Sequence, residues 1–448
     1  MLLNPAFLKF NRTPILLVIS GILFYFSFAY DLNRNDYLKL IMLYSALFFM
    51  FYKLVQLLKN HMSFLTWLAF IFRAIFLLSI PNLSQDFYRF IWDGRMIFEG
   101  FNPYLFTVES FISNNELPVE QALELFAGMG ELNASHFTNY PPLNQLCFVF
   151  AALFAGKSIL GSVAVLRILI IAADFGTLFF GKKLLEKLNI PVYHIFWYVL
   201  NPFIIIELTG NLHFEGIMIF FLVWSLYLLH IGKWQLSAVI FALSVSIKLI
   251  PLIFLPLFFQ KLNWKKSIVF YFITSLITIL FFIPFYSDTF ISNYTKTVGL
   301  WFKTFEFNAS LYYLAREIGY LFRGYNEIAV IGKITPLLVI VFVIIVTFFK
   351  KNKTTAELIT GMLLVLSFYY FTATTVHPWY IATLLILSIF TNYKFPLIWS
   401  FVIILSYLAY TNANNTENLW LIGIEYLIVY SALIWEVFYK KSHQKVAL

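Results

Sequence analysis

The sequence predicts an all-α, polytopic membrane protein with about 12 to 14 transmembrane helices. Of its 448 residues, 61% are hydrophobic and only 12% are charged, which is about half the charged fraction of an average soluble domain. Apolar runs of about 18 residues or more recur from end to end, and each is long enough to cross a hydrocarbon core. Aromatic residues make up 21% of the chain, which suits lipid-facing surface and headgroup belts. The composition argues against a soluble protein and predicts one transmembrane domain over residues 1–448.

The apolar runs define the expected spans, which share high hydropathy and few charges. They are 14–30, 37–58, 62–81, 159–181, 191–210, 215–231, 265–286, 329–349, 355–372, 378–392, 395–411 and 419–438. Two further segments are irregular. Residues 141–156 are apolar but short, and residues 234–260 are interrupted by Pro251 and Pro256.

Basic residues predict how these spans are oriented. Lysines and arginines concentrate at the two ends of the chain and in particular connections: Lys9, Arg12, Lys53, Lys59, Lys182, Lys183, Lys187, Lys233, Lys261, Lys265, Lys266, Lys350, Lys351, Lys353, Lys440, Lys441 and Lys445. The positive-inside rule places these residues, and therefore both termini, in the cytoplasm. The connections 82–140 and 287–328 are then external, and the first of them is rich in acidic residues.

This orientation constrains the two irregular segments. If Lys182 is cytoplasmic, residues 141–156 form a re-entrant or interfacial piece rather than a full crossing. Residues 234–260 must go out and return, but two halves of about 13 residues give only about 20 Å of helix each. We therefore expect a broken hairpin with Lys248 to Pro251 near its outer tip, lining a cavity. The alternative is strict alternation of full spans, which places Lys182 outside and residues 211–215 inside.

The first candidate for chemistry is Asp86, which follows Pro81 at the expected end of the third span. A carboxylate at the membrane boundary is partly desolvated, which raises its pKa and makes it a better base toward a hydroxyl. Arg89 lies one helical turn later and would face the same side, where its guanidinium suits a phosphate. The alternative is an ordinary ion pair in a solvated loop.

Other polar residues interrupt apolar sequence at positions that suggest a site. Tyr140 precedes Pro141 and Pro142, which mark the chain re-entering the membrane or simply a helix start. Glu207, His213 and Glu215 are titratable groups at membrane depth, where such groups are costly and usually functional. His213 and Glu215 also allow a metal-binding alternative, although no third ligand is evident from the sequence.

Three further positions complete the candidate set. Lys248 suits a phosphate contact, and the alternative is that its long side chain extends to the membrane interface. His377 lies beside Pro378 and aromatic residues at the edge of a span, where an aromatic belt is the simpler explanation. Arg167 and Asp174 are seven residues apart on one span, so they are expected to pair or to bind polar groups inside the bundle.

The ordered set of these motifs resembles a known superfamily. The matching residues are Asp86 to Arg89, Gly100 to Tyr104, Tyr140 to Leu143, Asn201-Pro202, Asn211 to Glu215, Lys248 to Pro251 and His377 to Tyr380. In order and rough spacing they resemble the GT-C glycosyltransferases that use polyprenyl-phosphate sugars. The polyprenol-phosphate-mannose-dependent mannosyltransferases of bacteria are the most similar, and the GPI-anchor mannosyltransferases are more distantly similar. The chain departs from the family pattern at Gln85, where a second acidic residue is common, and in having three spans before the first long external loop.

The resemblance implies a fold, an activity and site residues. It implies a GT-C-type hexosyltransferase whose external loop 82–140 is catalytic and in which Asp86 is the base. Arg89, Lys248, His213, Glu215, Tyr140 and His377 would bind the donor phosphate or sugar. It also implies sugar transfer with inversion from a polyprenyl-phosphate donor to an extracytoplasmic glycan or glycolipid acceptor, in a bacterial inner membrane. No cofactor and no nucleic acid is expected, although a divalent metal remains open.

Two other classes of membrane protein remain as alternatives. A transporter or flippase of lipid-linked sugars would also be polytopic with broken helices, but it would show inverted repeats, and no such symmetry is evident. An O-antigen ligase or polymerase would need an arginine-rich late loop, and the loop 287–328 contains only Arg316 and Arg323.

Overall fold

The computed structural model describes residues 5–303, 305–412 and 415–439. Within these ranges the regular structure is helical, apart from an isolated bridge between Phe307 and Thr375. By length and apolar composition, seven helices can cross a membrane, and a bent pair, Val192–Val199 with Pro202–Gly210, makes an eighth. Several other predicted spans are apolar helices of 10–17 residues. The polytopic, all-helical class is therefore confirmed, and these shorter helices account for the higher number of spans expected from hydropathy.

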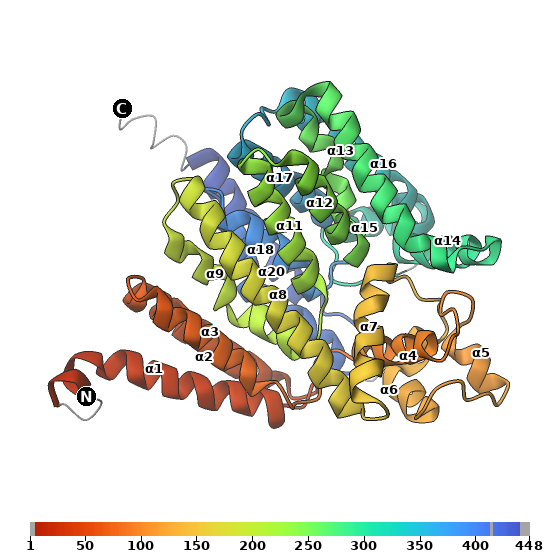
Figure 1. Cartoon of the computed structure of the whole chain (residues 1–448), viewed down its shortest axis with the longest axis horizontal. Helices are drawn as coiled ribbons and strands as arrows, with labels where there is room; N and C mark the ends of the chain where they lie inside the picture. Colours follow the sequence, from red (N-terminus) through yellow and green to blue (C-terminus); the bar gives the residue numbers. More distant parts are fainter. Residues whose placement is uncertain (1–4, 304, 413–414, 440–448) are drawn as a thin grey trace.

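Three helices open the chain and lie together at one side of the molecule (Figure 1). They are α1 (Pro5–Tyr30), α2 (Tyr37–Leu58) and α3 (Met62–Ile75). Asp36 caps α2 by accepting a hydrogen bond from the backbone of Lys39, as short polar side chains do at helix starts. Helix α3 ends six residues before the predicted end of its span, because the chain turns at Phe76 and continues without helix to Pro81.

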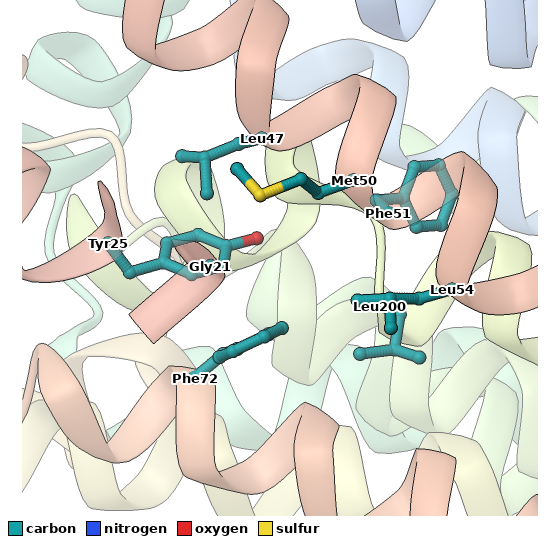
Figure 2. Close-up of a pocket in the computed structure, with 8 residues that line it drawn as sticks. All are labelled: Gly21, Tyr25, Leu47, Met50, Phe51, Leu54, Phe72 and Leu200. Carbon is teal, nitrogen blue, oxygen red and sulfur yellow. The ribbon is translucent and has the colours of Figure 1, made fainter. Parts of the chain in front are cut away.

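A small apolar crevice lies between these first helices, lined by Tyr25, Leu47 and Phe72 among others, with about 250 Å³ of empty space (Figure 2). Apart from the phenol of Tyr25, its lining carries no polar side chain. This crevice therefore offers no group for chemistry.

The predicted loop 82–140 folds into helices that gather, with the next helix, in one region of the molecule (Figure 1). They are α4 (Asp86–Phe98), α5 (Val108–Ser113), α6 (Ala122–Ala134) and α7 (Pro142–Ala155). Helix α4 packs very closely on α7 at Gly94, where an added Cβ would lie 2.3 Å from the carbonyl oxygen of Phe148. The absence of a side chain at Gly94 therefore allows α4 to lie directly on α7.

Helix α7 is the segment that the sequence predicted to be re-entrant or interfacial. Its start lies beside Lys248, whose Nζ is 5.6 Å from the centroid of the Tyr140 ring. Just beyond its end, Lys157 forms an ion pair with Glu120 of the loop 82–140. Tyr104 of the same loop donates to the carbonyl of Tyr140, so both ends of α7 contact the loop 82–140.

The central bundle begins with the longest helix, α8 (Ile159–Lys187), which Ser158 caps. A bent segment follows: η1 (Val192–Ile195), α9 (Phe196–Val199), α10 (Pro202–Ile204) and the π-helical η2 (Ile205–Gly210). The next elements are α11 (Glu215–His230), α12 (Trp234–Ile247) and the 3₁₀ helix η3 (Ile250–Leu257). Between the last two, Lys248 has an extended backbone with φ −146° and ψ 136°. The predicted break at Lys248 is therefore confirmed.

The remaining elements complete the bundle and carry the second predicted loop. They are α13 (Phe258–Phe282), η4 (Ile283–Phe285), α14 (Asp288–Lys303), α15 (Leu311–Arg323), α16 (Ile328–Phe349), α17 (Thr355–Thr372), η5 (Pro378–Tyr380), α18 (Ile381–Ile389), α19 (Phe395–Val402), η6 (Ile403–Thr411), α20 (Leu419–Ile434) and η7 (Trp435–Tyr439). The two long loops touch, since Asn293 donates a hydrogen bond to the carbonyl of Tyr104 and Tyr294 donates one to the carbonyl of Asn139.

Several lysine-rich connections meet at one end of the bundle. His230, at the end of α11, lies close enough to Lys187 and Lys261 to interact electrostatically. Glu357 brings in a third connection, because its charge acts on Lys261 and its carbonyl accepts a hydrogen bond from Lys350. Glu215 begins α11, which is about 24 Å long, so Glu215 lies at the opposite end from these lysines. Lys440, Lys441 and Lys445 lie outside the described residues.

Candidate active site

Asp86 is the first residue of α4, directly after the turn that follows α3. Its backbone N–H donates to Ser84 Oγ at 3.3 Å, and Asn133 Nδ2 donates to its carboxylate at 3.5 Å. The side chain is partly exposed, and it forms no ion pair with any residue that the structure describes. The carboxylate is therefore held at a helix start, where negative charge is favoured, and it remains available to a substrate.

Arg89 does not share this position with Asp86. Its side chain is 2% exposed, and its Nε donates to Asp93 Oδ1 at 2.8 Å. Its Nη1 donates to the carbonyls of Asn133 and His136, each at 2.9 Å. Asp86 and Arg89 both contact Asn133, so they lie on a common side of α4, but the guanidinium is paired with the buried Asp93 one turn further on. In this position Arg89 ties α4 to the end of α6.

Glu215 and Lys248 come together although 33 positions separate them. Lys248 Nζ lies 2.7 Å from Glu215 Oε1, with side-chain exposures of 22% and 4%. Glu215 Oε2 is buried and has no hydrogen-bond partner among the described residues. The break after α12 places the lysine at the start of α11, so the pair joins two neighbouring helices.

His213 lies in the turn between η2 and α11, and its ring stacks on Trp379 with 3.7 Å between centroids. Its Nε2 lies 3.9 Å from Glu207 Oε2, while Tyr407 donates to both oxygens of Glu207 at 2.8 and 2.9 Å. Burial lowers the pKa of His213 well below its usual value, and the charge of Lys248 lowers it further. The imidazole is therefore neutral.

His377 joins the same region through aromatic contacts. Its ring stacks on Trp379 at 4.6 Å and on Phe307 at 5.2 Å. Burial and the charge of Lys248 lower the pKa of His377 to about 3. Two neutral histidines thus both stack on Trp379, within electrostatic range of one lysine.

The predicted residues converge on one region, and Arg89 is linked to it through its charge acting on Tyr140. The pKa of Asp86 responds to the charges of Lys248 and Glu215. Tyr140 interacts electrostatically with Asp86 and Glu215, and His213 does so with Lys248 and His377. The structure thus places a carboxylate, an ion pair and two neutral imidazoles within interaction range, although they come from four separate segments.

Buried arginines hold the backbone on both sides of this region. Arg167 donates to the carbonyls of Leu77 and Ser79, before Asp86, and to those of Thr209 and Gly210, before His213. Asp174 instead pairs with Arg73, whose Nε lies 2.7 Å from its carboxylate. Arg167 and Asp174 were expected either to pair with each other or to bind other polar groups inside the bundle. They do not pair, and each binds other polar groups. Arg167 therefore connects the two segments that carry the candidate residues.

A metal site is the alternative for His213 and Glu215. Among the residues that the structure describes, no group of three His, Cys, Asp or Glu side chains is arranged to hold a metal ion. Glu215 pairs with Lys248 and His213 stacks on Trp379 instead. The contacts of His213 and Glu215 in the structure therefore do not support a metal site among the described residues.

The sequence analysis missed Arg34, Tyr407 and Tyr410. The guanidinium carbon of Arg34 lies 3.4 Å from the centroid of the Tyr410 ring, and its charge acts on Asp86 and Glu207. One signal could have revealed it. Under the predicted topology the turn between α1 and α2 is external, so a basic residue there is an exception to the positive-inside rule.

The pKa of Asp86 gives a first prediction. Desolvation raises the pKa of this carboxyl above its ordinary value, Glu215 raises it further, and Lys248 and Arg34 oppose the rise. If Asp86 acts as a base, it must be ionised, so kcat/KM should fall as the pH is lowered through this raised pKa. The check is a profile of kcat/KM from about pH 4 to 8, a range that begins near the ordinary pKa of an aspartate. A profile that stays flat to the acid limit would contradict the assignment.

Comparison with known proteins supplies the family. Residues 33–263 match the family described as alpha-(1->6)-mannopyranosyltransferase, N-terminal domain. This match covers slightly more than half of the 448 residues, and it contains Arg34, Asp86, His213, Glu215 and Lys248. No curated protein matches the chain significantly.

The matched region thus runs from the turn that carries Arg34 to beyond the break that carries Lys248. It covers every segment of the candidate site except those with Phe307, His377, Trp379, Tyr407 and Tyr410. The chain belongs to the alpha-(1->6)-mannopyranosyltransferase family and is a membrane-embedded glycosyltransferase of the GT-C type.

Proposed function

We propose that this protein transfers a mannosyl group, with inversion, from a polyprenyl-phosphate carrier to a hydroxyl of an extracytoplasmic glycan. The observation that carries the proposal is the environment of Asp86. It is a partly exposed carboxylate with no ion-pair partner among the described residues, and the cations Lys248 and Arg34 lie within electrostatic range. A base beside positive charge suits a reaction in which a hydroxyl attacks and a phosphate leaves.

The residues of the candidate site account for the proton, the new bond and the leaving group of this transfer. Asp86 accepts the proton of the acceptor hydroxyl while that oxygen bonds to the anomeric carbon. The bond from the anomeric carbon to the phosphate oxygen breaks, and its electron pair leaves with the polyprenyl phosphate. Lys248 stabilises the charge that develops on this leaving group. A β-linked mannosyl donor then gives an α-linked product, which agrees with the linkage in the family description.

A groove beside the site has a mixed polar and apolar lining. It offers about 480 Å³ of empty space, and its lining combines the apolar Pro336, Val339 and Ala373 with the hydroxyl-bearing Thr335, Tyr369, Thr372, Thr374, Thr375 and Tyr380. Helix α16 is mostly unburied and strongly apolar, so it suits contact with lipid. Tyr380 connects the groove to the site, because it interacts electrostatically with Asp86 and Glu215.

The side of the membrane follows from the lysine-rich end of the bundle. If those connections are cytoplasmic, the site at the other end faces the extracytoplasmic side, in a bacterial inner membrane. Cysteines placed at the exposed positions Glu116 and Lys353, with Cys147 replaced by alanine, should then react with impermeant maleimide from opposite sides. Labelling of both from one side would reject this orientation.

The function is tested with purified protein in detergent or nanodiscs. The donors are polyprenyl-phosphate mannose, polyprenyl-phosphate glucose and GDP-mannose, and the acceptor is an α-mannoside with a free 6-hydroxyl. Transfer from polyprenyl-phosphate mannose to give an α-(1→6) product supports the proposal. Transfer from GDP-mannose alone would reject the lipid carrier. Movement of the donor across a bilayer without transfer would support the flippase alternative, which the family match disfavours.

Lys248 gives a second prediction. The Lys248→Met variant should lower kcat/KM for the lipid-linked donor by about ten- to a hundredfold, the usual worth of a hydrogen bond to a charged group. The loss should appear in both KM and kcat, because the ammonium contacts the donor phosphate in the bound state and also stabilises the charge that develops as the phosphate leaves. Lys248→Arg keeps the charge and should recover part of the loss. Steady-state kinetics of the two variants decide the matter, and an unchanged kcat/KM in Lys248→Met would remove the lysine from donor binding.

A further inference from the structure

Arg34 reaches the candidate site from a part of the chain that is distant in sequence. It lies in the short turn between α1 and α2, and its guanidinium covers the ring of Tyr410, which belongs to η6. Tyr410 in turn packs on Phe307 with 5.7 Å between ring centroids. Both Arg34 and Tyr410 are partly exposed. Arg34 is therefore held by an aromatic face rather than by a carboxylate.

A line of stacked rings connects this arginine to the histidines. Phe307 stacks on His377, His377 on Trp379, and Trp379 on His213, with interplanar angles of 28°, 3° and 16°. Tyr410 also stacks on Phe307, at 29°. The stack fixes the turn between α1 and α2 against the segments that carry His377 and His213, so Arg34 has a defined place beside the site.

The charge of Arg34 is less compensated than that of the other cations near the site. Lys248 pairs with Glu215, and Arg89 pairs with Asp93. Arg34 forms no ion pair with any residue in the described part of the chain, and its buried Nε has no hydrogen-bond partner there. Lys39 is the other cation near this turn, and it pairs with Asp31. A planar guanidinium with unused donors suits a phosphate oxygen.

We propose that Arg34 binds the phosphate of the lipid carrier, opposite Lys248. The inference rests on the proposed function and names a donor contact that the motif comparison did not include. We prefer Arg34 to Arg89 as the guanidinium that receives the phosphate, because Arg89 already has an ion pair with Asp93 and donates to two backbone carbonyls, whereas Arg34 forms no ion pair with any described residue. With Lys248 held by Glu215 until the donor binds, Arg34 provides the charge that attracts it.

The test measures binding of the product, polyprenyl phosphate, to full-length protein in nanodiscs of phosphatidylcholine. Arg34→Gln should weaken this binding by about ten- to a hundredfold, and Arg34→Lys should lie between this variant and the wild type. Binding of the uncharged polyprenol should not change. Lys39→Gln is the matched control, since it removes a cation from the start of α2 that already has a partner, and it should bind as the wild type does.

Three outcomes would overturn the inference. The first is equal binding of polyprenyl phosphate by Arg34→Gln and the wild type. The second is a parallel loss of polyprenol binding or of thermal stability in both Arg34 variants, which would make the arginine structural. The third is equal competition by phosphatidylglycerol or by inorganic phosphate, which would make the site a general phosphate site. If the wild type binds polyprenyl phosphate through Arg34 but transfers no sugar from any donor, the proposed function fails and the phosphate contact stands.

Discussion

The Asp86→Asn variant is expected to lose about a hundred- to ten-thousandfold in turnover, the usual contribution of a general base. Asparagine has the same shape but cannot accept the acceptor's proton. The substitution leaves the N–H of residue 86 free to donate to Ser84 Oγ, as it does in the native protein at 3.3 Å, so α4 should begin at the same place. The measurement is the initial rate of transfer from polyprenyl-phosphate mannose, with binding of polyprenyl phosphate and the Tm followed in parallel.

The control for this variant lies at the other end of the same helix. Glu99 follows α4 and is exposed, so Glu99→Gln removes a carboxylate of the same loop without touching the site. It should retain wild-type turnover, Tm and binding. Full activity in Asp86→Asn would end the assignment of the base. A loss of activity that follows a loss of Tm would instead show that Asp86 supports the fold.

Hydropathy predicted the helical segments well, because a run of apolar residues reports directly on contact with lipid or core. Tyr37–Leu58 and Thr355–Thr372 begin and end where the sequence placed them. The end of α3 was misplaced, because residues 76–80 remain mostly apolar after the helix has ended. The carbonyls of Leu77 and Ser79 accept hydrogen bonds from Arg167 of another helix, and this is a tertiary contact that a local pattern does not contain.

The partners of charged side chains could not be predicted in the same way. Position along a helix gives the depth and the face of a residue, but it does not say which helix lies opposite. Arg167 and Asp174 share a face of α8, yet they contact different neighbours, since Asp174 forms an ion pair with Arg73 of α3. Likewise Arg34 and Tyr410 are 376 positions apart, and the contact between them depends on the packing of α1 and α2 against the last third of the chain.

In the candidate site, too, the sequence predicted individual residues but not the contacts that depend on how distant segments pack. Asp86 and Lys248 could be identified because each interrupts or ends an apolar run, where a charge is costly. The pairing of Lys248 with Glu215 required the break after α12 to face the start of α11. The spacing of residues along the sequence does not predict the stack that joins His213 to His377 through Trp379, because its rings come from two distant turns.

The Asp174→Leu variant is expected to be the most destabilised single variant, losing about 3–5 kcal/mol. Arg73 and Asp174 are both fully buried, and their contact of 2.7 Å joins α3 to α8. Removing the carboxylate leaves a buried guanidinium whose charge is no longer compensated. Arg73 keeps its hydrogen bonds to the carbonyls of Ala69 and Val199, but neutral carbonyls do not replace an opposite charge. Thermal unfolding in detergent measures the loss, and Asp31→Asn, which removes an exposed ion pair, should leave the Tm unchanged.

A double variant separates the cost of the unpaired charge from the worth of the pair. Replacing a whole buried pair with apolar residues is often neutral, whereas removing one partner is not. Arg73→Met combined with Asp174→Leu should therefore be more stable than Asp174→Leu alone, although the carbonyl of Val199 loses its donor. A double variant no more stable than the single one would mean that the shape of the pair, and not its charge balance, holds α3 against α8. Because α8 also carries Arg167, which binds the carbonyls before Asp86 and before His213, either variant should lower transfer activity in step with its Tm.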